Sequence, residues 1–348
     1  MKASDLLVRS LEVEGVEYIF GLPGEELEDL MFSLRDSSIQ YIPVRHEQGA
    51  AFMADVHGRL TGDAGVCLST LGPGATNLLT GVADAHLDKS PTVAITGQGS
   101  RERLHKESHQ ALDIVKMFEP VTKWNTQLTD SETIPEAVRK AFKIAEFEKP
   151  GATHLEFPED VAAAEIEATP LSPRPRVRRP DPDQASVEYA VDLIESASAP
   201  VVLAGNGAVR TRAAERLRAL IDRTKMPVVA TYMGKGAVSD RMNYSLMTLN
   251  SGPNDEAAAA IDRADCVVAV GYDIAEHDPQ SWNPDLDKQI IHIDSEPAEV
   301  YRHYNPDVEL VADIGAALED LDARLGTAVG PEWSHEFREP VVTDAYRP

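Results

Sequence analysis

The stretch Gly65-Val-Cys-Leu-Ser-Thr-Leu-Gly-Pro-Gly-Ala-Thr-Asn77 joins the three features that decide the fold. An apolar run over Gly65–Leu68 predicts a buried strand, and the spacing of apolar residues over Ala75–His86 predicts a helix. Between them a Gly-Pro-Gly turn stands at the start of the helix, where backbone N–H groups could bind an anion. The turn lacks the lysine and the spacing of a phosphate-binding P-loop, so the stretch predicts a strand–turn–helix unit of a parallel sheet.

The same alternation of strands and helices extends along the chain in both directions. Further strands are predicted at Tyr18–Phe20, Tyr41–Val44, Thr92–Ile95 and Thr153–Phe157, and helices at Ser4–Glu14, Glu25–Leu34, Gln48–Leu60 and Pro135–Glu146. A second series has strands at Val201–Ala204, Val228–Thr231, Cys266–Val270 and Ile290–Ile293, and helices at Ser186–Ser196, Arg212–Arg223, Glu256–Ile261 and Ile314–Leu325. This alternation predicts the α/β class: two doubly wound parallel-sheet domains, the second of them Rossmann-like, with helices on both faces of each sheet.

A proline-rich stretch divides the two series. Five prolines fall within residues 170–182, which predicts extended chain rather than a helix or a central strand. The stretch also carries Arg174, Arg176, Arg178 and Arg179. We interpret it as a linker held against acidic domain surfaces, and a nucleic-acid-binding arm is the alternative. The predicted organisation is a first domain at residues 1–167, a linker at 168–183, a second domain at 184–326, and a tail or severed linker at 327–348.

The composition indicates a cytoplasmic protein with substantial apolar cores. The 348 residues suggest two domains, and 43% of them are hydrophobic, which excludes wholesale disorder. No apolar run approaches the roughly 20 residues of a membrane helix, and the first residues lack the apolar core of a signal peptide. Cys67 and Cys266 each lie in an apolar run, so we expect buried thiols rather than a disulfide or a metal site.

The acidic balance argues against nucleic-acid binding. The 58 acidic and 33 basic side chains give a net charge of −25. The excess is spread evenly, with 27 acids against 15 bases in residues 1–166 and 24 against 12 in residues 184–326. Phosphate contacts need a basic face, which such a distribution does not offer. Acidic residues spread along the whole chain, together with only 11 lysines beside 22 arginines, favour a halophilic source. The alternative is an ordinary acidic cytosolic protein.

Four polar clusters follow predicted strands of the first domain. They are Phe20–Glu25, Arg45–Ala51, Ser69–Asn77 and Lys106–Asp113, with Pro120–Trp124 close behind the last. The carboxyl ends of the strands build the site of a doubly wound sheet, although each cluster alone is also compatible with an ordinary turn or helix cap. In the second domain, Gly205-Asn-Gly207 follows a strand, but Arg210 stands where a third dinucleotide glycine would be, so the evidence for a dinucleotide is weak.

Together and in this order, the clusters resemble thiamine-diphosphate-dependent enzymes of the acetolactate synthase family. The motifs that carry the resemblance are FGLPG at 20–24, RHEQGA at 45–50, GRLTG at 58–62, GPGATN at 72–77, PVTK at 120–123, PEDV at 158–161, MGKG at 233–236 and IHID at 291–294. The resemblance runs from residue 4 to about 325. His109-Gln110 and the segment Gly271–Pro279 are more similar to the catabolic, FAD-independent branch than to the biosynthetic one.

The resemblance implies a reaction and a role for each matched residue. The family decarboxylates pyruvate and condenses the two-carbon unit with a second pyruvate to give 2-acetolactate. Glu47 would be the catalytic residue, whose carboxylate hydrogen-bonds the aminopyrimidine ring of the cofactor and favours the tautomer that takes the thiazolium proton. The cofactor-binding residues implied in the same way are Gly21, Leu22, Pro23, Gly24, Thr70, Gly72, Pro73 and Asn77. His109, Gln110 and Lys123 would line the active site and steer the substrate.

The resemblance also implies partners and parts that the chain itself lacks. The family holds the diphosphate and Mg²⁺ through a C-terminal domain with a Gly-Asp-Gly triplet, and this sequence has no such triplet. We therefore assign no metal ligand here and expect the chain alone to be inactive. We expect no FAD, no nucleic acid and no membrane, but a homodimer or homotetramer that acts on a small 2-oxo acid. The alternatives are a related 2-oxo acid decarboxylase or carboligase, and a non-catalytic subunit on the same scaffold.

The charge predicts that stability depends on salt. Repulsion among dispersed carboxylates destabilises the compact state when screening is weak, so the melting temperature should rise between about 0.1 M and 2 M potassium chloride. Melting curves followed by circular dichroism over this range test the prediction. A parallel series in sucrose separates charge screening from the general effect of excluded solutes. An unchanged melting temperature in potassium chloride would remove the halophilic interpretation.

Overall fold

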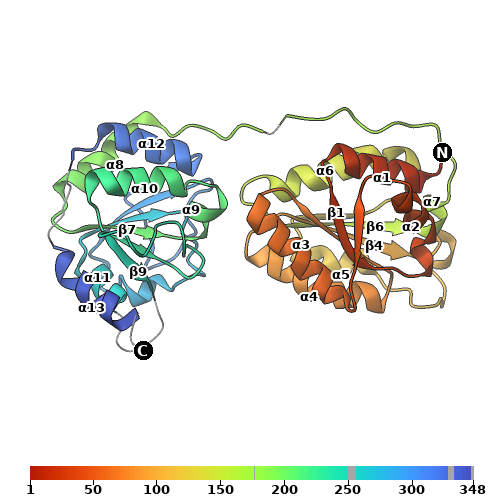
Figure 1. Ribbon diagram of the computed structural model, residues 1–348, viewed down its shortest axis with the longest axis horizontal. Helices are drawn as coiled ribbons and strands as arrows, with labels where there is room; N and C mark the ends of the chain where they lie inside the picture. The colour runs from red at the N-terminus through yellow and green to blue at the C-terminus, as the bar shows by residue number, and fades with distance from the viewer. Residues whose placement is uncertain (176, 250–255, 328–332, 346–348) are drawn as a thin grey trace. The chain divides into compact units, whose positions relative to one another are not determined.

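The chain forms two compact units in the computed structural model, Met1–Val177 and Arg178–Pro348 (Figure 1). The structure describes residues 1–175, 177–249, 256–327 and 333–345. The division between the units falls inside the proline-rich stretch at 168–183. Each unit holds one six-stranded sheet whose named strands pair in parallel, so the predicted α/β class with two doubly wound sheets is confirmed.

The sheet of the first unit has the strand order β2-β1-β3-β4-β6-β5. Its strands are β1 (Tyr18–Leu22), β2 (Gln40–Pro43), β3 (Gly65–Ser69), β4 (Thr92–Gln98), β5 (Trp124–Gln127) and β6 (Ala152–Pro158). Strands β3, β4 and β6 are buried at every position, as expected where helices cover a parallel sheet on both faces. The direction of strand addition reverses between β1 and β3, which makes the crevice beyond their carboxyl ends the switch point of this sheet.

Helices cover both faces of this sheet (Figure 1). One layer contains α1 (Ala3–Val13), α2 (Glu28–Arg35), α6 (Ile134–Glu146) and α7 (Glu159–Ala162), and the other contains α3 (Glu47–Thr61), α4 (Pro73–Leu87) and α5 (Ile114–Phe118). Each layer encloses its own apolar core, with Leu6 and Phe142 in the first and Leu78 and Phe118 in the second. Short 3-10 helices occupy Glu25–Leu27, Arg101–Arg103, Glu119–Val121 and Ser131–Thr133.

All strands and helices predicted for the first unit are present, with bounds that move by a few residues. Helix α3 begins at Glu47 rather than at Gln48, which places Glu47 in the first helical turn. The segments α5, α7 and β5 were not predicted. Strand β5 is half-buried along its length and carries three polar residues in succession, Asn125 to Gln127, so no apolar pattern marks it.

The sheet of the second unit has the strand order β12-β11-β10-β7-β8-β9. Its strands are β7 (Pro200–Ala204), β8 (Val228–Ala230), β9 (Ser245–Thr248), β10 (Cys266–Val270), β11 (Gln289–Asp294) and β12 (Val308–Val311). Helices α8 (Gln184–Ser196), α9 (Asn206–Arg210), α10 (Ala214–Thr224) and α12 (Ile314–Arg324) cover one face, α11 (Glu256–Arg263) and α13 (His335–Ala345) cover the other, and a 3-10 helix occupies Pro279–Ser281. The direction of strand addition reverses between β7 and β10, which is the order of a Rossmann fold.

The second unit contains elements that the sequence pattern did not predict. Two are the outer strands β9 and β12, and two are the helices α9 and α13. The expectation of an aperiodic tail after residue 326 is wrong for residues 333–345, which include α13. Trp333 and Phe337 pack against the apolar core, and Arg338 donates a hydrogen bond to the backbone oxygen of Asp240 at 2.7 Å. Val341, one helical turn after Phe337, is buried as well, and Pro340 inside the helix is the residue that argued against a helix here.

Two arginines of the proline-rich stretch bind carboxylates, as the acidic-surface interpretation predicts. Arg174 Nη2 lies 2.8 Å from Glu146 Oε2 in the first unit. Arg179 Nη1 lies 3.2 Å from Asp313 Oδ2 in the second unit. Arg176 lies outside the described residues.

Both cysteines are free and buried, as predicted. Cys67 lies in β3 and Cys266 in β10, and burial raises the pKa of each thiol to about 12. Within the described ranges, no helix has the length and the apolar character that a membrane span requires.

Candidate active site

The turns that follow β1 and β3 meet at the switch point of the first sheet. Gly24 lies so close to Thr70 that a Cβ at position 24 would clash with the threonine side chain. Thr70 Oγ1 donates a hydrogen bond to Glu26 Oε2 at 2.7 Å, which ties the two turns together. A side chain at position 24 would therefore push the two turns apart.

A second close approach brings the segment 104–113 onto the Gly-Pro-Gly turn. Gly72 has a φ of +52°, a conformation that favours glycine, and a Cβ there would clash with the backbone oxygen of Gln110. Pro73 occupies the first position of α4, where its restricted φ suits a helix start. Gln110 itself has a φ of 54°, so two tight turns make this contact.

Glu47 is the first residue of α3, and its side chain is buried, with 6% of its surface exposed. Asn77 Nδ2, from the start of α4, donates a hydrogen bond to Glu47 Oε2 at 3.0 Å. His46 caps α3, because its Nδ1 accepts a hydrogen bond from the backbone N–H of Gln48 at 3.2 Å. The carboxylate therefore lies at the positive end of a helix and is held by an amide from a second helix.

The hydrogen bond between Glu47 and Asn77 depends on the close packing of α3 against α4. Gly81 in α4 faces Ala51 in α3, and a Cβ at Gly81 would lie 2.5 Å from the Cβ of Ala51. Ala50 and Ala51 are completely buried. Small side chains on both helices let the two backbones approach, which brings the Asn77 amide within reach of the carboxylate.

The surroundings of Glu47 fit the pyrimidine half of thiamine diphosphate. Oxygen Oε2 is bonded to Asn77, whereas Oε1 receives no hydrogen bond from any described residue. A carboxylate oxygen left open in this way can accept the proton of a ring nitrogen. Gly74 lies beside this oxygen, where a Cβ would be in van der Waals contact with it at 3.5 Å and would clash with the Thr70 methyl group at 2.8 Å. A side chain at position 74 would therefore crowd the open acceptor.

The structure brings the predicted cofactor-binding residues to the carboxyl edge of the sheet. They are Gly21, Leu22, Pro23 and Gly24 at the end of β1, and Thr70, Gly72, Pro73 and Asn77 after β3. Gly21 also lies against Leu68 of the neighbouring strand, where a Cβ would be 2.6 Å from the backbone oxygen. Strand packing alone therefore accounts for the glycine at position 21, and cofactor binding by these residues stays a prediction.

The other predicted residues divide between the two edges of the sheet. His109 and Gln110 are exposed on the segment 104–113, and Gln110 contacts Gly72 at the carboxyl edge. Lys123 instead precedes β5, and its Nζ donates to the backbone oxygens of Phe147 and Lys149, at 2.8 and 2.6 Å, ahead of β6. Because the strands are parallel, Lys123 and its two carbonyl partners lie at the amino edge of the sheet. Glu47 lies at the carboxyl edge, at the other end of the strands. The expectation that Lys123 lines the site with the others is therefore not met within this unit.

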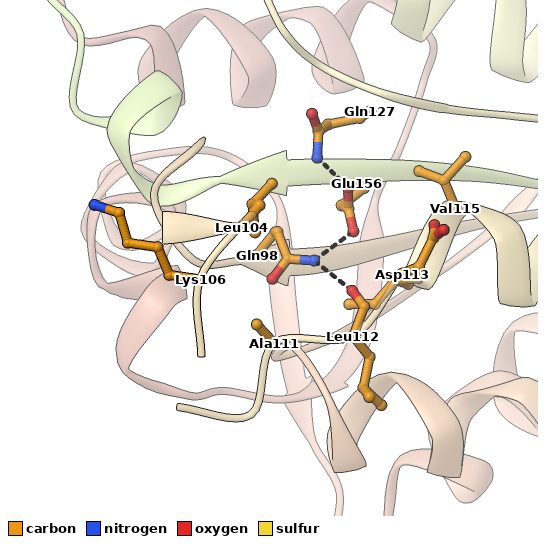
Figure 2. Close-up of a pocket in the computed structure, with 10 residues that line it drawn as sticks. Gln98, Leu104, Lys106, Ala111, Leu112, Asp113, Val115, Gln127 and Glu156 are labelled. Carbon is orange, nitrogen blue, oxygen red and sulfur yellow. Dashed lines mark hydrogen bonds between the residues drawn. The ribbon is translucent and has the colours of Figure 1, made fainter. Parts of the chain in front are cut away.

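Sequence reasoning missed a polar network at the carboxyl ends of β4, β5 and β6. Glu156 in β6 is 2% exposed, and it accepts hydrogen bonds from Gln98 Nε2 at 2.8 Å and from Gln127 Nε2 at 2.5 Å (Figure 2). Burial raises the pKa of the Glu156 carboxyl. The hydrogen bonds from Gln127 and Gln98 lower this pKa, but burial has the larger effect. The signal that could have found it is a single acidic residue inside a predicted core strand, Ala152–Pro158, all of whose positions are buried.

The glycine turn of the second unit is filled by groups of the chain itself. A Cβ at Gly205 would lie 2.5 Å from the backbone oxygen of Gly271, so the turns after β7 and β10 pack directly together. The Glu276 carboxylate accepts hydrogen bonds from the backbone N–H of Asn206 at 3.1 Å and from the Thr231 hydroxyl. A carboxylate therefore holds the turn at which a Rossmann fold would bind a cofactor phosphate.

Two further polar residues at the end of β11 have structural partners. His292 Nδ1 lies 2.8 Å from the Tyr304 hydroxyl, and its Nε2 lies 3.0 Å from the backbone oxygen of Glu296. Asp294 Oδ1 accepts from the backbone N–H of Ser295 at 2.6 Å. In the described part of the chain, no group of three or more His, Cys, Asp or Glu side chains is arranged to hold a metal ion.

Two protein-family profiles match the chain. The profile "Thiamine pyrophosphate enzyme, N-terminal TPP binding domain" matches residues 1–117, and the profile "Thiamine pyrophosphate enzyme, central domain" matches residues 187–321. The chain belongs to the thiamine pyrophosphate enzyme family and carries its N-terminal and central domains.

Within this class, the chain is similar to proteins named acetolactate synthases. It is 37% identical over 334 residues to the probable acetolactate synthase large subunit of Methanocaldococcus jannaschii, a match that covers 93% of this chain and 56% of that protein. It is 36% identical over 325 residues to the acetolactate synthase of Bacillus subtilis, with 92% and 56% covered. It is 38% identical over 328 residues to the catabolic acetolactate synthase of Raoultella terrigena, with 92% and 58% covered. The chain thus spans little more than half the length of these relatives.

The hydrogen bond between Asn77 and Glu47 predicts a stability effect. Asn77→Leu should lower the free energy of unfolding by about 1–3 kcal/mol, because it leaves a buried carboxylate oxygen without its donor. In a Glu47→Gln background the same change should cost less, since no charged acceptor is left unpaired. Urea denaturation of the four proteins gives the coupling energy, and Thr80→Leu on the exposed side of α4 is the control. A coupling energy near zero would contradict the prediction.

Proposed function

We propose that the chain is the pyrimidine-binding and central part of an acetolactate synthase, which decarboxylates pyruvate and condenses the two-carbon unit with a second pyruvate to give 2-acetolactate. The observation that carries this proposal is the buried Glu47 carboxylate, with one oxygen open beside the switch point of the first sheet. The relatives named acetolactate synthases, which match 92–93% of the chain, support the choice of reaction.

In this proposal Glu47 holds a proton on the pyrimidine ring. When bound, thiamine diphosphate would supply a nucleophilic thiazolium carbon for reaction with a 2-oxo acid. Glu47 Oε1 would accept the hydrogen bond of the ring nitrogen, while Asn77 holds Oε2 and fixes the orientation of the carboxylate. Buried neighbours such as Ala50 and Ala51 lower the local dielectric constant, which strengthens a charge-assisted hydrogen bond.

The remaining cofactor assignments follow from the same proposal. The diphosphate and Mg²⁺ would be held by a further domain, since the described residues offer no three-ligand group for a metal. FAD would not be required. The turn after β7, where a flavin dinucleotide phosphate would bind in a Rossmann fold, already binds the Glu276 carboxylate, and this supports the proposal.

Two alternative functions use the same scaffold. A related 2-oxo acid decarboxylase or carboligase would employ Glu47 in the same way, so only the identity of the product separates it from an acetolactate synthase. A non-catalytic subunit would have no use for a buried carboxylate with an open oxygen, because such a group is costly to keep in an apolar place without a function. The geometry at Glu47 therefore favours an enzyme.

The reaction is tested with a protein of the relatives' length that contains this chain. It should convert pyruvate to acetolactate with thiamine diphosphate and Mg²⁺ and without added flavin, and the chain alone should form none. Glu47→Gln should lower the rate by about 10²- to 10⁴-fold, because it removes the positioned proton acceptor. Glu132→Gln, at an exposed residue of the same unit, should leave the rate unchanged.

The possible outcomes separate the proposals. Carbon dioxide without acetolactate would favour the decarboxylase. Equal rates for Glu47→Gln and the unchanged protein would exclude the role of Glu47, and a requirement for flavin would exclude the proposal on FAD.

We further propose that the protein works in the cytoplasm of a halophile as a homodimer or homotetramer. The free, buried thiols are compatible with a reducing compartment, and the dispersed acidic residues support adaptation to high salt. Helix α3 presents a stripe of apolar side chains at Met53, Val56 and Leu60, which are 40%, 49% and 79% exposed. Their spacing puts them on one face of the helix that carries Glu47, and a second copy of the chain would cover that face.

The stripe predicts the outcome of a mass measurement. Val56→Glu combined with Leu60→Glu should halve the molar mass in light scattering, because charges replace the centre of an apolar contact. Phe147→Glu, at a 48% exposed residue elsewhere in the first unit, serves as the control. An unchanged mass in the double variant, or a monomeric starting protein, would contradict the proposed interface.

A further inference from the structure

A pocket of about 490 Å³ lies at the carboxyl ends of β4, β6 and β5 (Figure 2). The Gln98–Glu156–Gln127 network lines it from the strands, and Leu104, Leu112 and Ile114 line it from the segment that follows β4. Its volume falls within the range of roughly 300–1,000 Å³ that is typical of small-molecule sites. This pocket is partly open to solvent, and its lining combines apolar side chains with converging polar groups, both of which small-molecule sites use.

Glu156 is a buried carboxyl group with no basic side chain bound to it among the residues that the structure describes. Its only hydrogen-bond donors among the described residues are the amides of Gln98 and Gln127, which carry no charge. Lys106 also lines the pocket, but its ammonium group points away from the carboxylate (Figure 2). Asp113 lies near enough to add to the negative potential at Glu156. A buried negative charge held in this way is costly unless a positive group binds next to it.

The hydrogen-bond geometry leaves room for such a group. Each oxygen of Glu156 accepts one amide hydrogen bond and keeps further acceptor capacity, since a carboxylate can accept about four. Both N–H groups of the Gln98 amide are engaged, because Nε2 also donates to the backbone oxygen of Leu112 at 3.0 Å, and its Oε1 accepts from the backbone N–H of Gly99. An anion would meet two carboxylates in this pocket, and a neutral apolar ligand would leave the charge of Glu156 uncompensated.

We infer that this pocket binds a small organic cation, with an ammonium or amidinium group against Glu156 and an aliphatic body along Leu104 and Leu112. The inference goes beyond the proposed function, because it concerns a different place on the sheet from Glu47. The two places share a wall, since the segment 104–113 that lines the pocket also contacts the Gly72 turn through Gln110. A cation bound in the pocket would therefore order the segment that borders the candidate active site.

The test uses n-butylammonium chloride as the probe and ligand-observed NMR titration of the 348-residue chain as the readout. Butan-1-ol, of the same length and without charge, and butyrate, with the opposite charge, are the comparison ligands. We expect saturable binding of n-butylammonium, and binding of both comparison ligands that is weaker by about tenfold or more, since a charge-assisted hydrogen bond and ion pairing are lost.

Three variants locate the binding. Glu156→Gln should weaken n-butylammonium binding by about tenfold or more, because it removes the negative charge and keeps the shape of the side chain. Ala111→Phe should weaken it as well, because the larger ring obstructs the pocket and leaves the carboxylate in place. Glu136→Gln, which removes an exposed carboxylate of α6, is the matched control and should bind as the unchanged chain does. Circular dichroism confirms that each variant is folded.

Three outcomes would overturn the inference. They are the absence of saturable n-butylammonium binding, equal binding by Glu156→Gln, and equal binding of butan-1-ol. The titration is repeated with Glu47→Gln, which should bind n-butylammonium unchanged. Failure of the proposed carboligase activity and failure of this pocket are therefore distinguished, because the first depends on Glu47 and the second on Glu156.

Discussion

The contact of Ala51 with Gly81 is the constraint on which the candidate site depends. It sets the separation of α3 and α4, and that separation decides whether the Asn77 amide reaches the Glu47 carboxylate. The same two helices connect the edge of the sheet to its centre, since α3 leads from β2 to β3 and α4 leads from β3 to β4. A larger side chain at either contact would separate the helices before it disturbed the sheet, and the carboxylate would lose its partner first.

Both units are doubly wound parallel sheets, but they use the switch point of the sheet differently. Each sheet has a switch point at which turns from two neighbouring strands meet, and in each a glycine allows the turns to touch. In the first unit the touching turns leave Glu47 Oε1 free for a ligand. In the second, Glu276 bonds to the turn after β7.

The sequence allowed the fold to be predicted wherever burial leaves a regular pattern. Strands covered on both faces are apolar runs, and helices such as α6 have apolar residues at intervals of three and four. The pattern failed at β5, which is half-buried and polar, and at α13, where Pro340 interrupts a short apolar stripe. Local periodicity reports the surface that an element buries, so elements with little buried surface do not show it.

The candidate site could be predicted from the sequence only in part. Motif order brought Glu47 and the two turns to one edge, because parallel strands end together. The order of the motifs did not show on which edge of the sheet Lys123 lies, because a motif does not tell which end of a strand it adjoins. In the structure this lysine lies at the amino edge. Glu156 was missed for another reason. Its partners Gln98 and Gln127 precede it by 58 and 29 residues, and only the strand order β4-β6-β5 places β6 between them.

The burial of both cysteines has a practical consequence for studying this protein. A thiol reacts as the thiolate, and a pKa of about 12 leaves almost none of it at neutral pH for Cys67 or Cys266. The chain is in effect free of reactive thiols without any substitution. A single cysteine introduced on the segment 104–113 would therefore be the preferred point of attachment for a maleimide dye or spin label, and its signal would report the motion of that segment alone.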